Sequence, residues 1–478
     1  MQMKPILHAL GLHLYQPHGN LHKLLAENPG ELRRILLCYE RIGRYAHKYA
    51  GVARFHLAFS TVLLEQLQDP TLIEACRELV DIPSILENLR SAASMEFVGT
   101  GFRHAPLPFI PPEDWEEQLQ RERKYIATAF GHVMKGYWPP ASVFSEEMIP
   151  VLVKAGYEYL LLPSNMLTMP DGSDADPFLP YQLSFKGSSI TVIPLDRGFS
   201  QAQENGLEAP WFADEVRNGV SLALPYSAPY LLTTWSDGEN GEWFRTDEEH
   251  GFFGRFFSPY MEFCEIGAFP VQPMSIPEYL RNYPPQTKVT LRAEFKENLV
   301  FPGDPAVKRK LFKTVAHYWS MAETTPGQVV PPSHAMMEAR SLLLRAEESG
   351  LLLGDASCHA ILLDLLKQAE KHLATKTSDI PVSESIMPRQ EGTKKPPQLQ
   401  ERETLQTPSI QASSPIPTKA KIDEKIPLTS HQSKEKKAIQ SSDKTNTQPE
   451  TRLPEPVVSK TAGVSSLKLV SPPKDEIR

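Results

Sequence analysis

The sequence predicts an α/β barrel that is followed by a small helical region and a disordered tail. Strand-like and helix-like segments alternate about seven times over residues 1–305, which favours a parallel sheet closed into a barrel. Helical spacing replaces this alternation over residues 306–375. From residue 376 to 478 aromatic residues are absent, and Pro, Ser, Thr, Lys, Gln and Glu dominate. An open, doubly wound sheet is the alternative to the barrel.

The elements of the barrel can be placed in chain order. Strands are expected at residues 6–14, 52–60, 94–101, 159–164, 188–196 and 229–239. The helices between them carry start and stop signals: Ser60 or Thr61 is a candidate N-cap, and Pro111 and Gly131 bracket another helix. Beyond the barrel, apolar residues recur at amphipathic helical spacing in residues 307–322, 334–350 and 361–375.

The composition excludes several classes of protein. The net charge of −8 argues against a general nucleic-acid binder, which carries a basic stripe. The N-terminus lacks a basic start and no apolar run is long enough to span a membrane. The four cysteines, Cys38, Cys76, Cys264 and Cys358, form no close pair that suits structural zinc. We therefore expect a cytoplasmic protein with reduced thiols and neither metal nor other cofactor.

The tail, residues 376–478, buries too little apolar surface to offset its ordering entropy. A solvated tail is the simpler interpretation. A docking segment for a protein partner is the alternative.

In a parallel barrel, functional groups lie where strands end and loops begin. The first strand leads into His13 and Gln16, and the strand that ends near Gly99 and Gly101 leads into His104. A histidine in such a position is also a good candidate for a satisfied core residue.

Tryptophans and acids follow the other strands. Trp138 stands before two prolines, and a rigid loop with a flat ring suits stacking on a sugar. Asp237 and Glu239 lie between Trp235 and Trp243 at a strand end, which fits acid–base work on a carbohydrate. The alternatives are a loop packed on its own tryptophan and an Asp-Gly turn with surface acids.

Four stretches, HLYQPHGN, EFVGTGFRHAP, GYWPPASVFSEEMIPVLVKAGYEYLLLPS and TTWSDGENGEWF, resemble successive motifs of glycoside hydrolase family 57. The resemblance implies an incomplete (β/α)7 barrel with associated helices, acting on α-glucans or related α-linked sugars with retention of configuration. It also implies that Asp237 is the general acid/base and that His13 and His104 face the sugar. An oligosaccharide or α-glucan is the expected partner.

The sequence departs from the family at the nucleophile. The resemblance implies a glutamate three residues after Trp138, where this chain has Ala141. A retaining glycosidase needs two carboxyl groups about 5 Å apart, and alanine supplies none. Glu146 and Glu147 lie on the following helix and are expected to be solvated acids at its start.

Three hypotheses follow. The chain is a family relative that binds α-glucans with weak or no hydrolysis; or it is an enzyme in which water, phosphate or a substrate group occupies the space at Ala141; or its barrel is only a scaffold. The retained sugar-facing motifs count against the scaffold.

Overall fold

The computed structural model describes residues 6–219, 229–322 and 333–374, which belong to one compact unit. The predicted tail, residues 376–478, lies outside the described residues.

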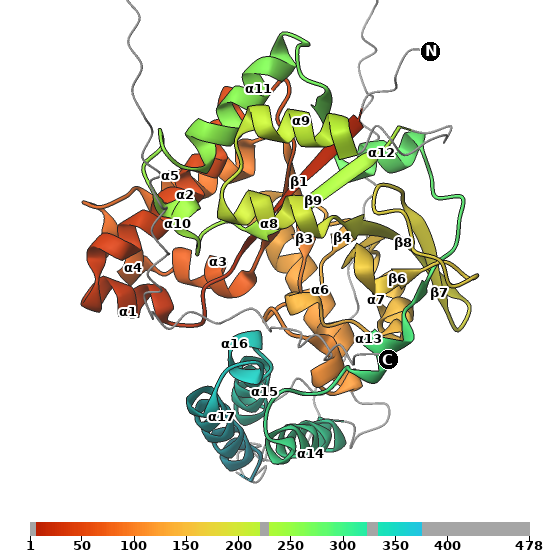
Figure 1. The fold of residues 1–478 in the computed structure, drawn as a ribbon. Coiled ribbons are helices and arrows are strands. Elements are labelled where there is room, and N and C mark those ends of the chain that lie inside the picture. The colour runs from red at the N-terminus through yellow and green to blue at the C-terminus, as the bar shows by residue number, and fades with distance from the viewer. Residues whose placement is uncertain (1–5, 220–228, 323–332, 375–478) are drawn as a thin grey trace, which may run out of the picture. The chain divides into compact units, whose positions relative to one another are not determined.

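The core of the fold is a ring of seven parallel strands in the order β9-β1-β2-β3-β4-β5-β8 (Figure 1). Strands that follow one another in the chain are mostly neighbours in the sheet, as in a barrel and unlike a doubly wound sheet. Their bounds are β1 (Ile6–Leu14), β2 (Phe55–Phe59), β3 (Met95–Gly99), β4 (Gly136–Tyr137), β5 (Tyr159–Pro163), β8 (Ser188–Leu195) and β9 (Leu231–Asp237).

The ring is incomplete between β8 and β9, the two strands at the ends of this order. The backbone N–H of Asp196, just after β8, donates to the carbonyl of Thr233 in β9 at 2.9 Å, but the two strands share no pairing ladder. Further short strands lie at the margins: β7 (Tyr181–Phe185), β10 (Val271–Pro273) and the pair β6 (Leu167–Thr168) and β11 (Thr290–Leu291). The fold is thus the predicted α/β barrel in its incomplete form.

Helices surround the strands, and their ends follow local chemistry. The Ser60 hydroxyl accepts the N–H of Leu63 as the N-cap of α3, and Gly131 ends α6 in the left-handed region at φ 75°. The helices of this part are α1 (Asn20–Glu27), α2 (Pro29–Lys48), α3 (Thr61–Leu67), α4 (Pro70–Cys76), α5 (Ile82–Ser91), α6 (Pro112–Phe130), α7 (Ile149–Ala155), α8 (Arg197–Asn205), α9 (Ala209–Gly219), α10 (Glu242–Arg245), α11 (Ser258–Glu265), α12 (Ile276–Asn282) and α13 (Ala293–Glu297).

Four helices follow the barrel: α14 (Pro305–Ala322), α15 (His334–Ala346), α16 (Ser349–Leu352) and α17 (Ala356–Ala374). Helices α14 and α15 contact α6 through polar side chains. Arg340 of α15 donates to Asp114 at 2.9 Å and to Glu117 at 2.6 Å. Trp319 of α14 donates its indole N–H to Asp114 at 2.7 Å. Because Asp114 is fully buried, removing either partner would leave a desolvated charge.

Two apolar cores stabilise the fold. The larger fills the space between the sheet and its helices. The smaller, which includes Trp138, Tyr159, Leu161, Ile193 and Trp235, comes largely from residues of the strands and their exits. All four cysteines are free thiols. In the described ranges, no helix is both long enough and apolar enough to cross a membrane.

Candidate active site at the carboxyl ends of the strands

His13 reaches the carboxyl end of β1 and stands at the centre of the candidate site. It pairs in register with Asp237, the last residue of the neighbouring strand β9. Its Nε2 lies 2.9 Å from the Nε2 of His104, and the two rings stack with centroids 4.8 Å apart. The histidines that the sequence places after two different strands therefore meet.

His104 is held in an unusual backbone conformation. Its φ is 52°, which non-glycine residues rarely adopt, and its N–H donates to the carbonyl of Gly101 at 2.7 Å. Such a conformation persists only when its surroundings enforce it. This loop brings the His104 ring against His13 of β1.

Helix α6 supplies the groups that hold this loop. The buried carboxylate of Glu122 accepts the N–H of Thr100 at 2.7 Å and the N–H of Gly101 at 2.8 Å. Gln118 accepts the N–H of Arg103 at 2.9 Å. Burial raises the pKa of Glu122 to about 7, against the pull of these donors. The strand exit is thus fixed from behind by two side chains of one helix.

Glu348, just before α16, and the first two residues of α16 complete the site from the far end of the chain. The Ser349 hydroxyl lies 2.6 Å from Nδ1 of His104. Tyr15 donates its hydroxyl to Glu348 at 2.8 Å and accepts the N–H of Gly350 at 3.1 Å. Sequence reasoning missed these residues, because a short polar stretch at a helix end gives no sign of burial. The available signal is the pair of adjacent acids, Glu347 and Glu348, which stands between two apolar segments.

Both histidines are neutral near pH 7. Burial lowers the pKa of His13 to about 4, although the charge of Asp237 opposes the shift. Burial and the neighbouring His13 lower the pKa of His104 well below its usual value. Neutral imidazoles both donate and accept hydrogen bonds, as recognition of hydroxyl groups requires.

Asp237 caps the turn that follows β9. Its Oδ1 accepts the N–H groups of Glu239 at 3.0 Å and Asn240 at 3.1 Å, and its Oδ2 accepts the Asn240 amide at 2.6 Å. The Asp-Gly turn that was an alternative to a catalytic role is therefore present. The turn orients the carboxyl group of Asp237 beside His13. This geometry is compatible with a structural role and with a catalytic one.

Glu239 is fully buried next to the backbone of Tyr15. Its Oε1 accepts the N–H of Tyr15 at 2.7 Å. Its Oε2 has no hydrogen-bond partner among the described residues, although the Tyr39 hydroxyl is close enough to lower the pKa of this carboxyl. Burial and the charge of Asp237 outweigh that effect and raise the pKa of Glu239 well above its usual range.

Trp138 and Trp235 lie at the same end of the strands as His13, but their side chains are almost completely buried. Their rings stack with centroids 5.8 Å apart, and Trp138 lies 4.7 Å from the ring of His13. Their exposed fractions are 9% and 7%. Trp235 packs so closely on β1 that a Cβ at Gly11 would lie 1.9 Å from the indole. The face that they leave for a sugar ring is small.

Two predicted site residues lie apart from the histidines. Trp243 packs against the core between sheet and helices. Gln16 is buried and accepts the side-chain amide of Asn20 at 2.6 Å, while its Nε2 has no partner in the described part of the chain.

The exit of β4 carries Ala141. It lies in a single 3₁₀ turn, Pro140–Ser142, is exposed, and has φ 51°. The nearby Glu146 forms an ion pair with Lys296 at 2.9 Å, and Glu147 is exposed. The sequence analysis expected both acids at the start of the following helix, but they lie in a 3₁₀ turn, Glu146–Met148, directly before α7.

The model of glycosyl hydrolase family 57 matches residues 17–264, about half of the chain. The chain belongs to glycosyl hydrolase family 57. It is 24% identical to alpha-amylase 1 of Dictyoglomus thermophilum over 322 residues, which cover 65% of this chain and 43% of that protein. It is 27% identical to a 4-alpha-glucanotransferase of Thermococcus litoralis over 194 residues, or 41% of this chain and 27% of the relative.

Solved structures share the fold at low identity. The Thermococcus litoralis 4-alpha-glucanotransferase matches with a TM-score of 0.53 and 20% identity, over 77% of this chain and 60% of that one. A family 57 branching enzyme of Thermococcus kodakaraensis matches with a TM-score of 0.55 and 14% identity, over 78% and 88%. The chain spans less than half the length of the relatives to which its sequence aligns.

Proposed function

We propose that the carboxyl ends of the strands form a site that binds, and in an active form cleaves or transfers, α-glucans or related α-linked saccharides. The gathering of His13, His104 and Asp237 from three strand exits is the observation that carries this proposal. Family membership supports it, since relatives carry the names alpha-amylase, 4-alpha-glucanotransferase and branching enzyme.

In this proposal Asp237 is the general acid/base. It lies at the end of β9, oriented by its own turn, next to a neutral His13. His13 hydrogen-bonds a sugar hydroxyl, and His104 orients the His13 ring from its own position between His13 and Ser349. Trp138 and Trp235 provide the apolar floor beneath them.

Ala141 takes the position of the nucleophile. We propose that hydrolysis by the unaltered chain is weak, because a retaining mechanism needs a second carboxyl about 5 Å from the first. Glu146 does not replace it, since it pairs with Lys296. Glu239 does not replace it either, because it is buried behind Tyr15 with no exposed surface.

The second candidate function is a carbohydrate-binding protein that has lost catalysis. Two observations favour it: Ala141 has no carboxyl, and Trp138 and Trp235 pack mainly on each other and on the protein. It requires the same saccharide site but no turnover.

A panel of maltooligosaccharides and α-glucans separates these functions. Calorimetry should detect binding, and Trp235→Ala should weaken it at least tenfold by removing the floor of the site. Trp211→Ala, which changes an exposed tryptophan on α9, should bind like the unaltered protein. Chromatography of the incubated sugars then reports hydrolysis or transfer.

Absence of binding to every α-linked sugar would contradict the proposal in both forms. Because Trp235→Ala removes a core side chain, His104→Gln serves as a second variant that keeps the volume of the site. Binding that neither variant weakens would place the saccharide elsewhere.

A further inference from the structure

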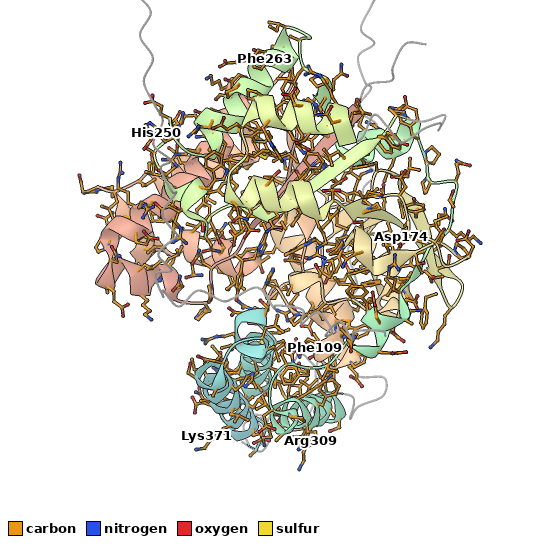
Figure 2. All side chains as sticks on the ribbon, in the orientation of Figure 1. Phe109, Asp174, His250, Phe263, Arg309 and Lys371 are labelled. Carbon is orange, nitrogen blue, oxygen red and sulfur yellow. The ribbon has the colours of Figure 1, made fainter. Side chains whose placement is uncertain are left out.

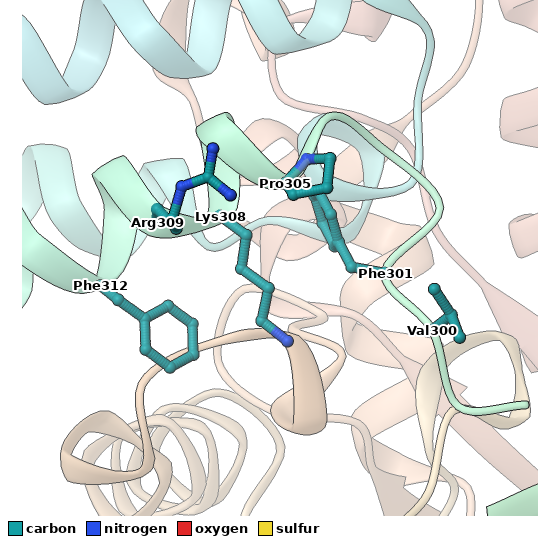
Figure 3. Close-up of a pocket in the computed structure, with 6 residues that line it drawn as sticks. All are labelled: Val300, Phe301, Pro305, Lys308, Arg309 and Phe312. Carbon is teal, nitrogen blue, oxygen red and sulfur yellow. The ribbon is translucent and has the colours of Figure 1, made fainter. Parts of the chain in front are cut away.

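A cavity of about 380 Å³ opens beside the first turns of α14, and the proposed saccharide site does not use it (Figure 3). It lies between that helix and the segment that precedes it. Its lining combines apolar side chains with two basic ones and contains no acid: Val300, Phe301, Pro305, Lys308, Arg309 and Phe312.

Lys308 lines this cavity and has no hydrogen-bond acceptor among the residues that the structure describes. Its ammonium lies 5.3 Å from the centre of the Phe109 ring and 5.4 Å from the centre of the Phe312 ring. Within the described part of the chain it forms no ion pair, and burial lowers its pKa. A partly desolvated ammonium that meets only ring faces is stabilised further by an anion.

Arg309 adds a second cation at the exposed rim. It too lacks an ion pair within the described ranges, and Figure 2 labels it together with Phe109. The adjacent Lys310 is different, because it pairs with Glu370 of α17. The ion pair with α17 thus neutralises Lys310. Lys308 and Arg309, which line the cavity, have no such ion pair among the described residues.

The start of α14 does not itself supply the positive charge. Asp304 caps the helix and accepts the N–H of Ala306 at 2.7 Å. The attraction for an anion comes from the two side chains, and the apolar character comes from the phenyl rings.

We propose that this cavity binds an organic anion with an aromatic or acyl body. The body packs on Phe301 and Phe312, and the anionic group pairs with Lys308 and Arg309. A neutral sugar suits the cavity poorly, because the lining offers few acceptors for hydroxyl groups. A metal cation is excluded by the two positive charges.

The cavity borders the loop that carries His104. Phe109 closes that loop in the 3₁₀ turn Leu107–Phe109 and packs edge-on against Phe301 at 5.6 Å. An anion held by Lys308 therefore lies against a segment that begins at the proposed saccharide site. The proposal itself does not depend on that site.

Ligand-observed NMR with three probes tests the proposal: phenylacetate, benzyl alcohol as its neutral counterpart, and inorganic phosphate as an anion without an apolar body. We expect phenylacetate to saturate with a Kd in the low millimolar range or below, as suits so small a ligand. Benzyl alcohol and phosphate should each bind at least about tenfold more weakly, since each lacks half of the recognition.

Variants of the full chain locate the binding. Lys308→Met and Arg309→Gln should each weaken phenylacetate, the first by about tenfold or more. Lys313→Met, which changes an exposed lysine of the same helix, should not. Arg309 is exposed, so its substitution keeps the test valid if Lys308→Met perturbs folding.

Equal binding of phenylacetate and benzyl alcohol would overturn the charged half of the proposal. Equal binding of phenylacetate and phosphate would overturn the apolar half. Loss of phenylacetate binding in Lys313→Met to the same extent as in Lys308→Met, or no saturation at all, would overturn the site.

Discussion

The exits of β3 and β4 are neighbours in the sheet, yet they are built in opposite ways. Val98 and Gly99 of β3 pair with Gly136 and Tyr137 of β4. After β3, Glu122 and Gln118 hold the backbone, and His104 meets both His13 and Ser349. After β4 the chain makes a 3₁₀ turn, Pro140–Ser142, in which the exposed Ala141 carries only a methyl group.

Both turns contain a non-glycine residue with positive φ, so both store backbone strain of a similar kind. At His104 the strain presents an imidazole to its partners. At Ala141 it presents only a methyl group. The same kind of backbone conformation thus carries a polar ring at the exit of β3 and a methyl group at the exit of β4.

The largest expected effect comes from placing a carboxyl group at the exit of β4. Ala141→Glu should raise α-glucan hydrolysis by several orders of magnitude, because catalytic groups act as a unit. The alanine already adopts positive φ and is exposed, so a glutamate adds little further strain. The rate of release of reducing ends, with the anomeric configuration followed by NMR, measures the gain.

Two controls accompany this variant. Ala141→Gln has the same size without a nucleophile and should stay at the starting rate. Adding Asp237→Asn to Ala141→Glu should abolish the gain. Ordinary hydrolysis with retention by the unaltered protein would show that the nucleophile is not at position 141.

Removing the carboxyl group that holds the backbone after β3 should give the next largest effect. Glu122→Leu removes the acceptor of two buried N–H groups and should lower the free energy of unfolding by about 3 kcal/mol in urea titrations. The ring signals of His104 should shift in NMR spectra. Glu113→Gln, on the exposed start of the same helix, should change the stability by less than about 0.5 kcal/mol. Similar values for both variants would show that Glu122 does not fix the loop.

The opposite end of β3 provides a pH-dependent comparison. Burial raises the pKa of Glu96 to about 7, and its Oε1 has no hydrogen-bond partner among the described residues. The folded state therefore keeps this proton to higher pH than the unfolded state, so stability falls as the pH rises from about 4.5 to about 7. Glu96→Gln should be more stable than the unaltered protein by about 3 kcal/mol at pH 8 and equal to it at pH 4.

Glu87→Gln, an exposed acid on α5, should show no such difference between the two pH values. Thermal unfolding at pH 4 and pH 8 provides the measurement. A Glu96→Gln variant that is less stable at pH 8 would mean that the ionised carboxylate is stabilised in the fold.

The smallest effect is expected from removing the predicted tail. A chain that ends at residue 376 should keep its melting temperature within about 2 °C, since that segment lacks the apolar residues of a core. Differential scanning calorimetry compares the two proteins. A larger loss would show that the tail packs on the unit formed by the preceding residues.

Much of the fold followed from local signals in the sequence. Ser60 and Gly131 mark helix ends through contacts within a few residues, and β1 and β9 are long enough for their pattern to show. The strand β4 has two residues, too few for any periodicity, although the motif around Trp138 marks its exit.

The candidate site was predicted in part. The motifs located His13, His104 and Asp237 because strand exits concentrate function, whereas the burial of Trp235 could not be foreseen. That burial depends on the missing side chain of Gly11, on another strand. The burial of Trp235 arises from packing between different strands. The pattern of residues within one segment carries no information about such packing.

The contact between His104 and Ser349 joins residues 245 positions apart, and the contact between Tyr15 and Glu348 spans 333. Such long closures slow folding, because the chain loses the entropy of the intervening loop before it gains the contact. During synthesis on a ribosome the barrel strands emerge well before Ser349 does. The nascent barrel therefore passes through a stage in which His104 lacks its hydroxyl partner, and the site reaches its final form only after the chain has been made past α16.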